Sequence, residues 1–383
     1  MIDDFITMAK RIERLKEAGN TKNIDAFLFT SASTIKCLSG FFYDFEIGAS
    51  PFQLLPAALL VIPSGNTSII MADNESFVTE AAGSEISVKS YSSYLYEKPL
   101  DFAAQFLFKL HESLIENNLS KALIGIEQNS LPFVIAQSIT SAYPKIKLVD
   151  VTDEITCLKA IKDSDEIELI RKATALCDIG QEAVLKRAKA GMTELELFSL
   201  VRTEMEASVG KRVPIMLDLV SGARTEEGGG SPSNNLIRNG DLILSDLTPC
   251  LDGYWGDTCN TIILGKPTTG QSRHYQLVQQ ALQSAIDFIR PGIKASEVDQ
   301  LLRKHLLAVG TYGHHSGHGV GTSYHEEPRI TPYNEMLLEP NMVIALEPAV
   351  YLNGYGIRLE HMVMVTHTGC EVISKFDHQF RKI

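Results

Sequence analysis

Two aspartates stand where an apolar strand and its return strand would bring them together. Asp246 follows the apolar run 242–245, and Asp257 directly precedes a second strand-like run. Between them lies Asp252-Gly253, a dipeptide typical of two-residue hairpin loops. Such a loop places position 246 opposite position 259, so that the two aspartates become diagonal neighbours on one face. The pattern predicts two converging carboxylates.

Two glutamates repeat this arrangement further along the chain. Glu347 directly follows the apolar run 343–346, and Glu360 directly follows the mostly apolar run 356–359. Asn353-Gly354 is the candidate turn between them, and it places position 347 directly opposite position 360. Unpaired carboxylates in such strands would repel each other and lose their hydration. A cation between them is the simplest way to accommodate both.

A histidine-rich segment, GHHSGHGVG at 313–321, lies between the two acidic pairs. Glycines beside His318 let the backbone approach a site closely, and imidazole is a common ligand of transition metals. Four carboxylates and one imidazole carry a charge of about −4, which two divalent ions neutralise and one does not. The full set therefore predicts a dinuclear metal centre built from Asp246, Asp257, His318, Glu347 and Glu360.

Each part of this set has a plainer explanation when it is taken alone. Either acidic pair fits a surface hairpin, His318 fits a polar loop, and the glycines fit a turn. The apolar strands around the acids argue against the surface explanation. The occurrence of all three elements in one half of the chain argues against it further.

Composition limits the class of protein. The 383 residues are more than one hydrophobic core usually supports, which predicts two domains. A net charge of −12 disfavours nucleic acid as a partner, because phosphate binding needs clustered Lys and Arg. No apolar run is long enough to cross a bilayer and the first residues do not resemble a signal peptide, so we expect a cytoplasmic protein without membrane contact. The six cysteines show no CxxC spacing, which predicts free thiols.

The two halves of the chain differ in their patterns, and we place the boundary near Cys157, giving domains 1–156 and 157–383. The first half alternates strand-like and helix-like stretches and predicts an α/β domain; these stretches are 26–29, 58–62, 102–115, 122–126 and 131–142. A charged helical stretch follows at 164–189, where Glu166 and its charged neighbours are typical of a solvated face. From residue 212 onward, strands and turns interrupted by helices at 275–289 and 295–309 predict an α+β domain around an antiparallel sheet.

The ordered set of five residues resembles the metal ligands of the pita-bread (M24) metallopeptidases, the family of methionine aminopeptidase, aminopeptidase P and prolidase. The spacing of eleven between the aspartates, the phrase GHGVG and the phrases LEP and RLE all match. The resemblance covers about residues 160–383. Residues 1–150 are similar to the creatinase-type N-terminal domain through DAFLFTSASTIKCLSGFF, which favours the aminopeptidase P, prolidase and creatinase branch. The implied fold is an α+β pita-bread catalytic domain preceded by a smaller α/β creatinase-type domain.

The resemblance also implies roles for single residues. Glu347 would move a proton, His325 would contact the scissile amide, and His314 would line the substrate pocket. Arg358 matches an arginine associated with the active site of proline-specific members. As alternatives, Arg358 only forms an ion pair with a neighbouring carboxylate, and the two histidines only donate hydrogen bonds to other site residues.

The implied activity is hydrolysis of an Xaa-Pro amide bond, as an Xaa-Pro dipeptidase or aminopeptidase, by a hydroxide that bridges two divalent metal ions. Mn²⁺ is the expected metal, with Co²⁺, Zn²⁺ or Fe²⁺ as alternatives. The expected partners are a small peptide or small amide substrate and a second copy of the chain in a homodimer. Two other functions stay open: a creatinase-like C–N hydrolase or metal-dependent lyase acting on a small non-peptide molecule, and a non-catalytic pita-bread binding protein.

One segment departs from the family pattern. Proline-specific members carry a histidine before the first aspartate, typically in a Pro-His-Tyr phrase after Ser-Gly. Here Ser221-Gly222 leads to Gly228–Ser233, which reads GGGSPS and holds no histidine. This departure predicts slow cleavage of Xaa-Pro peptides or a different small amide as substrate. The glycines fit either a loop over the site or a surface turn.

Overall fold

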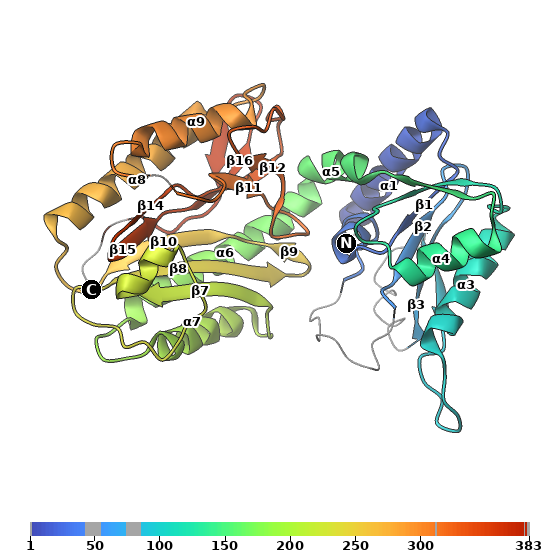
Figure 1. Cartoon of the computed structure of the whole chain (residues 1–383), viewed down its shortest axis with the longest axis horizontal. Coiled ribbons are helices and arrows are strands. Elements are labelled where there is room, and N and C mark those ends of the chain that lie inside the picture. Colours follow the sequence, from blue (N-terminus) through green and yellow to red (C-terminus); the bar gives the residue numbers. More distant parts are fainter. Residues whose placement is uncertain (1, 43–54, 74–85, 311, 379, 381–383) are drawn as a thin grey trace. The chain divides into compact units, whose positions relative to one another are not determined.

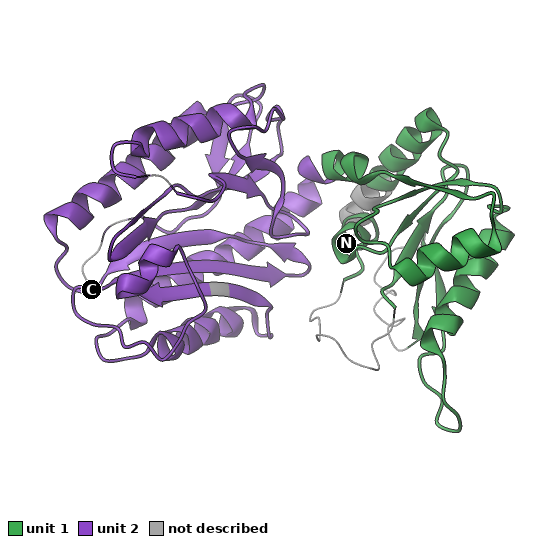
Figure 2. Ribbon diagram, in the orientation of Figure 1, with its two compact units in different colours: residues 1–158 green, residues 159–383 purple. Residues whose placement is uncertain are grey.

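The computed structural model describes residues 2–42, 55–73, 86–310, 312–378 and 380. The chain divides into two compact units, Met1–Leu158 and Lys159–Ile383 (Figure 2). All six cysteines are free thiols, as expected. Among the described helices, none is long and apolar enough to cross a membrane.

The first unit is built on a mixed six-stranded sheet of order β4-β3-β2-β1-β5-β6 (Figure 1). Side chains of a strand alternate between faces, and both faces of β1 are buried: Ala26 and Leu28 belong to one apolar cluster, Phe27 and Phe29 to the other. Neighbouring strands and helices complete each cluster, with α3 and α4 on one face of the sheet and α1 and α2 on the other, which confirms the expected α/β architecture. The elements up to the division are α1 (Ile2–Lys22), β1 (Ala26–Phe29), α2 (Ala32–Ser39), β2 (Ala58–Val61), β3 (Thr67–Ala72), β4 (Ile86–Tyr91), α3 (Phe102–Glu116), β5 (Leu123–Ile126), α4 (Phe133–Ala142), β6 (Lys147–Asp150) and α5 (Thr152–Ala160), which crosses it.

The second unit contains antiparallel sheets of order β10-β8-β7 and β12-β11-β13-β16-β17, together with the hairpin β14-β15 (Figure 1). Helices α6 and α7 pack on the first sheet, while α8 and α9 share a core with β13 and β15. The expected α+β class is confirmed. Its elements are α6 (Ser164–Arg187), α7 (Glu194–Val209), β7 (Ile215–Ser221), the 3₁₀ helix η2 (Gly222–Glu227), β8 (Leu242–Leu251), β9 (Tyr254–Trp255), β10 (Thr258–Ile263), α8 (Thr269–Phe288), α9 (Ala295–Leu306), β11 (Gly317–Gly319), β12 (Glu326–Ile330), β13 (Val343–Leu346), β14 (Ala349–Leu352), β15 (Tyr355–Arg358), β16 (His361–Val365) and β17 (Cys370–Val372).

The turn predicted at Asp252-Gly253 is confirmed. Both residues have positive φ, 53° and 82°, as a type I′ turn requires. The turn sets the register of the hairpin, in which Asp246 pairs with Cys259 as expected.

One helical assignment is wrong in detail. Glu166 on α6 is only 3% exposed and does not belong to a solvated face. Its carboxylate accepts hydrogen bonds from the backbone N–H of Asp163 and from the Tyr254 hydroxyl, so it caps the helix and fastens it to β9. A charged residue in the first turn of a helix can accept hydrogen bonds from the helix N-terminus instead of facing solvent.

Candidate metal centre

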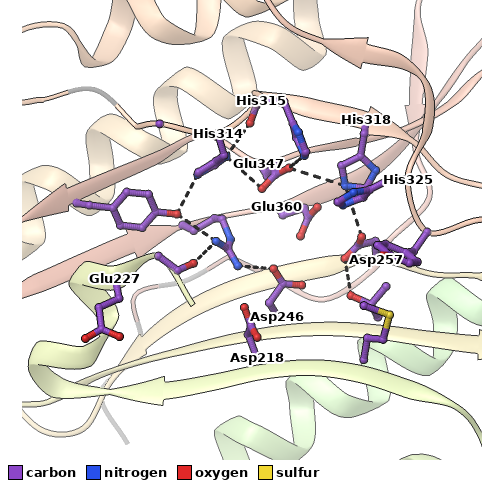
Figure 3. A pocket seen from close by; sticks show the side chains of 17 residues that line it. Asp218, Glu227, Asp246, Asp257, His314, His315, His318, His325, Glu347 and Glu360 are labelled. Atoms are coloured by element: carbon purple, nitrogen blue, oxygen red, sulfur yellow. Dashed lines mark hydrogen bonds and ion pairs between the residues drawn. The ribbon is translucent and has the colours of Figure 1, made fainter. Parts of the chain in front are cut away.

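The five predicted ligands line one cavity of about 540 Å³ in the second unit (Figure 3). The other residues assigned from the sequence line it too, namely His314, His325 and Arg358. Residues from both antiparallel sheets form its wall. The sequence did not single out several further lining residues, among them Asp218, Thr248, His315 and Tyr351.

Hydrogen bonds between β10 and the segment around Glu360 bring the two acidic pairs together. The backbone N–H of Glu360 donates to the Cys259 carbonyl over 2.8 Å. The Thr261 hydroxyl accepts from the Arg358 N–H at 3.1 Å and donates to the Arg358 carbonyl at 2.9 Å. These contacts join the hairpin that carries Asp246 and Asp257 to the one that carries Glu347 and Glu360.

The two glutamates lie at a break between two ladders that share one register. Leu346 pairs with His361 on one side of the break, and Ala349 pairs with Arg358 on the other. The predicted turn at Asn353-Gly354 is confirmed by the pairing of Leu352 with Tyr355. Glu347 and Glu360 thus stand where the strands separate, and both side chains reach the cavity.

The glycines on either side of His318 allow close packing of the neighbouring strands. A side chain on Gly317 would collide with the Ala345 carbonyl, and one on Gly319 would collide with the Glu327 carbonyl. The close approach expected from the sequence is therefore an approach to the neighbouring strands β13 and β12. It places His318 in the middle of three strands, with its side chain only 2% exposed.

The hydrogen bond of His318 leaves one ring nitrogen available as a ligand. Its Nδ1 lies 3.1 Å from the Gly319 carbonyl, which can only accept, so the proton sits on Nδ1. Burial lowers the pKa of His318 to about 3, so the ring is neutral. The unprotonated Nε2 then faces the Asp257 carboxylate at 3.5 Å and that of Glu347 at 3.8 Å. Lone pairs that face each other in this way call for a cation between them.

No lysine or arginine among the described residues forms an ion pair with the carboxylates of Asp257 and Glu360, and Asp257 faces only the neutral imidazole of His318. Burial, reinforced by the neighbouring acids, raises the pKa of both carboxyls well above the ordinary range. Asp257 accepts one hydrogen bond from the Thr248 hydroxyl at 3.0 Å, whereas Oε2 of Glu360 is buried without a partner. Asp257, His318 and Glu360 each present a ligand atom within 4.8 Å of the other two. The donor set therefore fits a divalent cation.

Arg358 lies beside Asp246 and forms an ion pair with its carboxylate. Its guanidinium donates to the Asp246 carboxylate, to the Gly228 carbonyl, and to the Tyr351 hydroxyl at 3.1 Å. Nδ1 of His314 lies 2.7 Å from a backbone carbonyl and must carry the proton, so its Nε2 accepts from Tyr351 at 2.9 Å. Despite the arginine, burial raises the pKa of Asp246.

Glu347 is surrounded by imidazoles. Nε2 of His315 lies 2.9 Å from its Oε1, and Nδ1 of His314 lies 3.5 Å from its Oε2. Burial alone would raise the pKa of Glu347, but these neighbours outweigh it and hold the pKa at about 2. Glu347 thus stays ionised at neutral pH without a metal.

The glycine-rich segment forms part of the cavity wall. Gly228 lines the cavity, and a side chain on Gly229 would collide with the carboxylate of Asp218. Asp218 lies directly opposite Asp246 in the β7–β8 ladder. The segment that lacks the histidine therefore makes room for an additional acid.

Comparison with known proteins finds matches to both units of the chain. The model of metallopeptidase family M24 matches residues 168–367, and that of the creatinase/prolidase N-terminal domain matches residues 11–161. The Xaa-Pro dipeptidase of Pyrococcus horikoshii is 31% identical over 68% of this chain and 76% of its own length. That of Pyrococcus furiosus is 30% identical over 71% of this chain and 79% of its own. The prolidase structure from Pyrococcus horikoshii OT3 superposes with a TM-score of 0.82 at 25% identity and covers 97% of this chain and 100% of its own.

Proposed function

The chain belongs to metallopeptidase family M24, and from this premise we propose that it is a metal-dependent peptidase acting on Xaa-Pro bonds of small peptides. One observation of the site carries the proposal: the free Nε2 of His318 faces the buried carboxylates of Asp257 and Glu347, and no lysine or arginine in the described part of the chain forms an ion pair with either. Relatives at about 30% identity that are Xaa-Pro dipeptidases support the substrate class.

Two divalent ions would be held by the five residues assigned from the sequence, Asp246, Asp257, His318, Glu347 and Glu360. Bound there, such ions lower the pKa of water and polarise the scissile carbonyl. The carboxylate-rich set favours a hard ion, and Mn²⁺ is the metal we propose.

The remaining residues would position the substrate and move protons. Glu347, ionised at neutral pH, is suited to take a proton and return it to the leaving amine. His325 and His314 line the same cavity and provide imidazoles beside the substrate. Arg358 binds both the Asp246 carboxylate and the Gly228 carbonyl. It would therefore orient Asp246 as a metal ligand and hold the Gly228 backbone in the cavity wall.

A homodimer, which the resemblance favours, is part of the proposal. The cytoplasmic location expected from the sequence stays a prediction. Neither affects the residues that form the cavity.

A panel of Xaa-Pro dipeptides and tripeptides tests the activity directly. The purified chain is stripped of metal and supplied with Mn²⁺, Co²⁺ or Zn²⁺, and the released amino acids are quantified. Metal-dependent cleavage before proline, greatest with Mn²⁺, is the expected result. Cleavage that survives without metal, or equal cleavage of peptides without proline, would contradict the proposal.

The Asp218 carboxylate favours a second candidate, hydrolysis or lysis of a C–N bond in a small non-peptide molecule. No residue in the described part of the chain donates a hydrogen bond to this acid, and Gly229 leaves it room at the cavity wall. An extra acid there suits a cationic substrate better than the carboxylate of a C-terminal proline. Turnover of small cationic amides with none of Xaa-Pro peptides would favour this candidate.

A further inference from the structure

His315 occupies a place in the cavity that suggests a metal ligand. With His318 and His325 it forms a group in which each histidine offers a ring nitrogen within 4.8 Å of the others. Its ring centroid lies 5.1 Å from each of the other two. Three imidazoles at such distances are a familiar ligand set for zinc.

The partners of His315 point to a different role. Its Nδ1 lies 2.9 Å from Nη2 of Arg329 on β12. A guanidinium has only donors and keeps its protons in proteins, so Nδ1 must be the acceptor and cannot carry a proton. With Nδ1 unprotonated, the ring proton is on Nε2, which lies 2.9 Å from Oε1 of Glu347.

His318 has the opposite arrangement. Its proton is on Nδ1, held by the Gly319 carbonyl, and its Nε2 is free. A histidine ligates a metal through an unprotonated nitrogen, and the hydrogen bond at the other nitrogen decides which one that is. Two histidines three positions apart thus both face the Glu347 carboxylate, His318 with a lone pair and His315 with an N–H.

We infer that His315, with its tautomer set by Arg329, is a positioning residue that donates from Nε2 to Glu347 and does not ligate the metal. The inference rests on the proposed function, because it assigns Glu347 as the proton carrier. The hydrogen bond fixes one oxygen of Glu347 and leaves Oε2 facing His314. Loss of a hydrogen-bonding partner of this kind costs about 10–100-fold in activity.

The substitutions His315→Gln and His315→Asn test whether the role of His315 is to donate a hydrogen bond from Nε2. The amide nitrogen of glutamine can take the place of Nε2, whereas that of asparagine corresponds to Nδ1 and stops short of Glu347. We expect His315→Gln to keep kcat within about threefold, while His315→Asn and His315→Ala lower it about 10–100-fold with little change in KM. Bound Mn²⁺ should be the same in all three variants. Equal kcat in the Gln and Asn variants, or loss of metal in the Ala variant, would overturn the inference.

The tautomer can be read without any activity. In the full-length, metal-free chain, ¹⁵N–¹H correlation spectra of the histidine rings should show the His315 proton on Nε2, with the signal assigned by its absence in His315→Gln. Arg329→Met should release Nδ1 and shift the proton toward it. Arg273→Met, which removes an exposed arginine on α8, should leave the His315 signal unchanged. A proton on Nδ1 in the unaltered protein would overturn the inference. Because this spectrum needs neither metal nor substrate, a failure of the proposed peptidase activity would be distinguishable from it.

Discussion

Glu326 and Glu360 are both buried acids of the second unit, and the chain treats them in opposite ways. Glu326 lies between Lys159 and Lys162, each with its ammonium 3.1 Å from a carboxylate oxygen. Burial would raise the pKa of Glu326, but the two lysines and the Ser323 N–H outweigh it and hold the pKa at about 2. Among the described residues no lysine or arginine forms an ion pair with Glu360, and burial, reinforced by the neighbouring acids, raises its pKa well above the ordinary range even though the charge of Arg358 lowers it.

The difference separates a structural carboxylate from a ligand. A buried charge is tolerated when the protein supplies hydrogen bonds and an opposite charge. Glu326 receives the opposite charge from the two lysines and a hydrogen bond from the Ser323 N–H, and it stands at the first residue of β12. None of the described residues forms an ion pair with Glu360, its Oε2 is buried without a hydrogen bond, and the charge of Arg358 does not outweigh burial and the neighbouring acids, so a cation from outside the chain would complete the site. The contrast is the physical basis for placing metals at Asp257 and Glu360.

Removing a proposed ligand is the most severe way to probe this contrast. Asp257→Ala or Glu360→Ala should lower kcat/KM at least about 10³-fold, because metal assistance supplies several kcal/mol of transition-state stabilisation. Metal content should fall in parallel, while the unfolding transition of the N-terminal unit is preserved. Near-normal bound metal in both variants would contradict the assignment.

A measurement on the unaltered enzyme separates metal binding from substrate positioning. Because Gly228–Ser233 holds no histidine, general acid–base help worth about 10²–10⁴-fold is missing. The metals should bind normally, yet Xaa-Pro dipeptides should turn over at least about 10²-fold more slowly than the ~10 per second typical of enzymes. Turnover at ~10 per second or faster would show that the missing histidine does not matter.

Arg358 tests the side of the site where the chain does supply a cation. Lysine keeps the charge but cannot reach Asp246, Gly228 and Tyr351 together. Arg358→Lys should therefore lower kcat about 10–100-fold, with metal still bound. Unchanged turnover would reduce Arg358 to a structural ion pair.

Stability against pH tests the paired carboxylate. A folded-state pKa of about 2, below the ordinary 4.5, means that Glu326 contributes stability that is fully present above pH 4.5 and lost as the pH falls toward 2. Glu326→Gln should cost about 3 kcal/mol at neutral pH and flatten the acid side of the stability curve. The same change at Glu168, which like its partner Lys172 is exposed to solvent, should cost less than about 1 kcal/mol. Equal costs would mean that the lysines around Glu326 do not stabilise it.

The sequence predicted those parts of the site that local geometry controls. Asp252-Gly253 sets the register of its hairpin through backbone conformation alone, so the convergence of Asp246 and Asp257 follows from a few adjacent residues. The order of the five proposed ligands, together with the family resemblance, brought the remaining residues to one site.

The parts that escaped prediction depend on contacts between distant elements. His315 was visible in the motif, but its role comes from Arg329, which reaches it from another strand. Asp218 lies opposite Asp246 only because β7 pairs with β8, and no local signal marks that register. Glu166 is a charged residue in a charged stretch, which is typical of a surface, but it is buried and bonded to Tyr254.

Counting bound metal tests the central claim most directly. The metal-free chain is equilibrated with Mn²⁺, and the bound ion is measured by elemental analysis, alongside Glu360→Gln and the exposed control Glu168→Gln. We predict two ions per chain for the unaltered protein and for Glu168→Gln, and fewer than two for Glu360→Gln. One ion or none in the unaltered protein, or two ions in Glu360→Gln, would contradict the account of these carboxylates as a dinuclear metal centre.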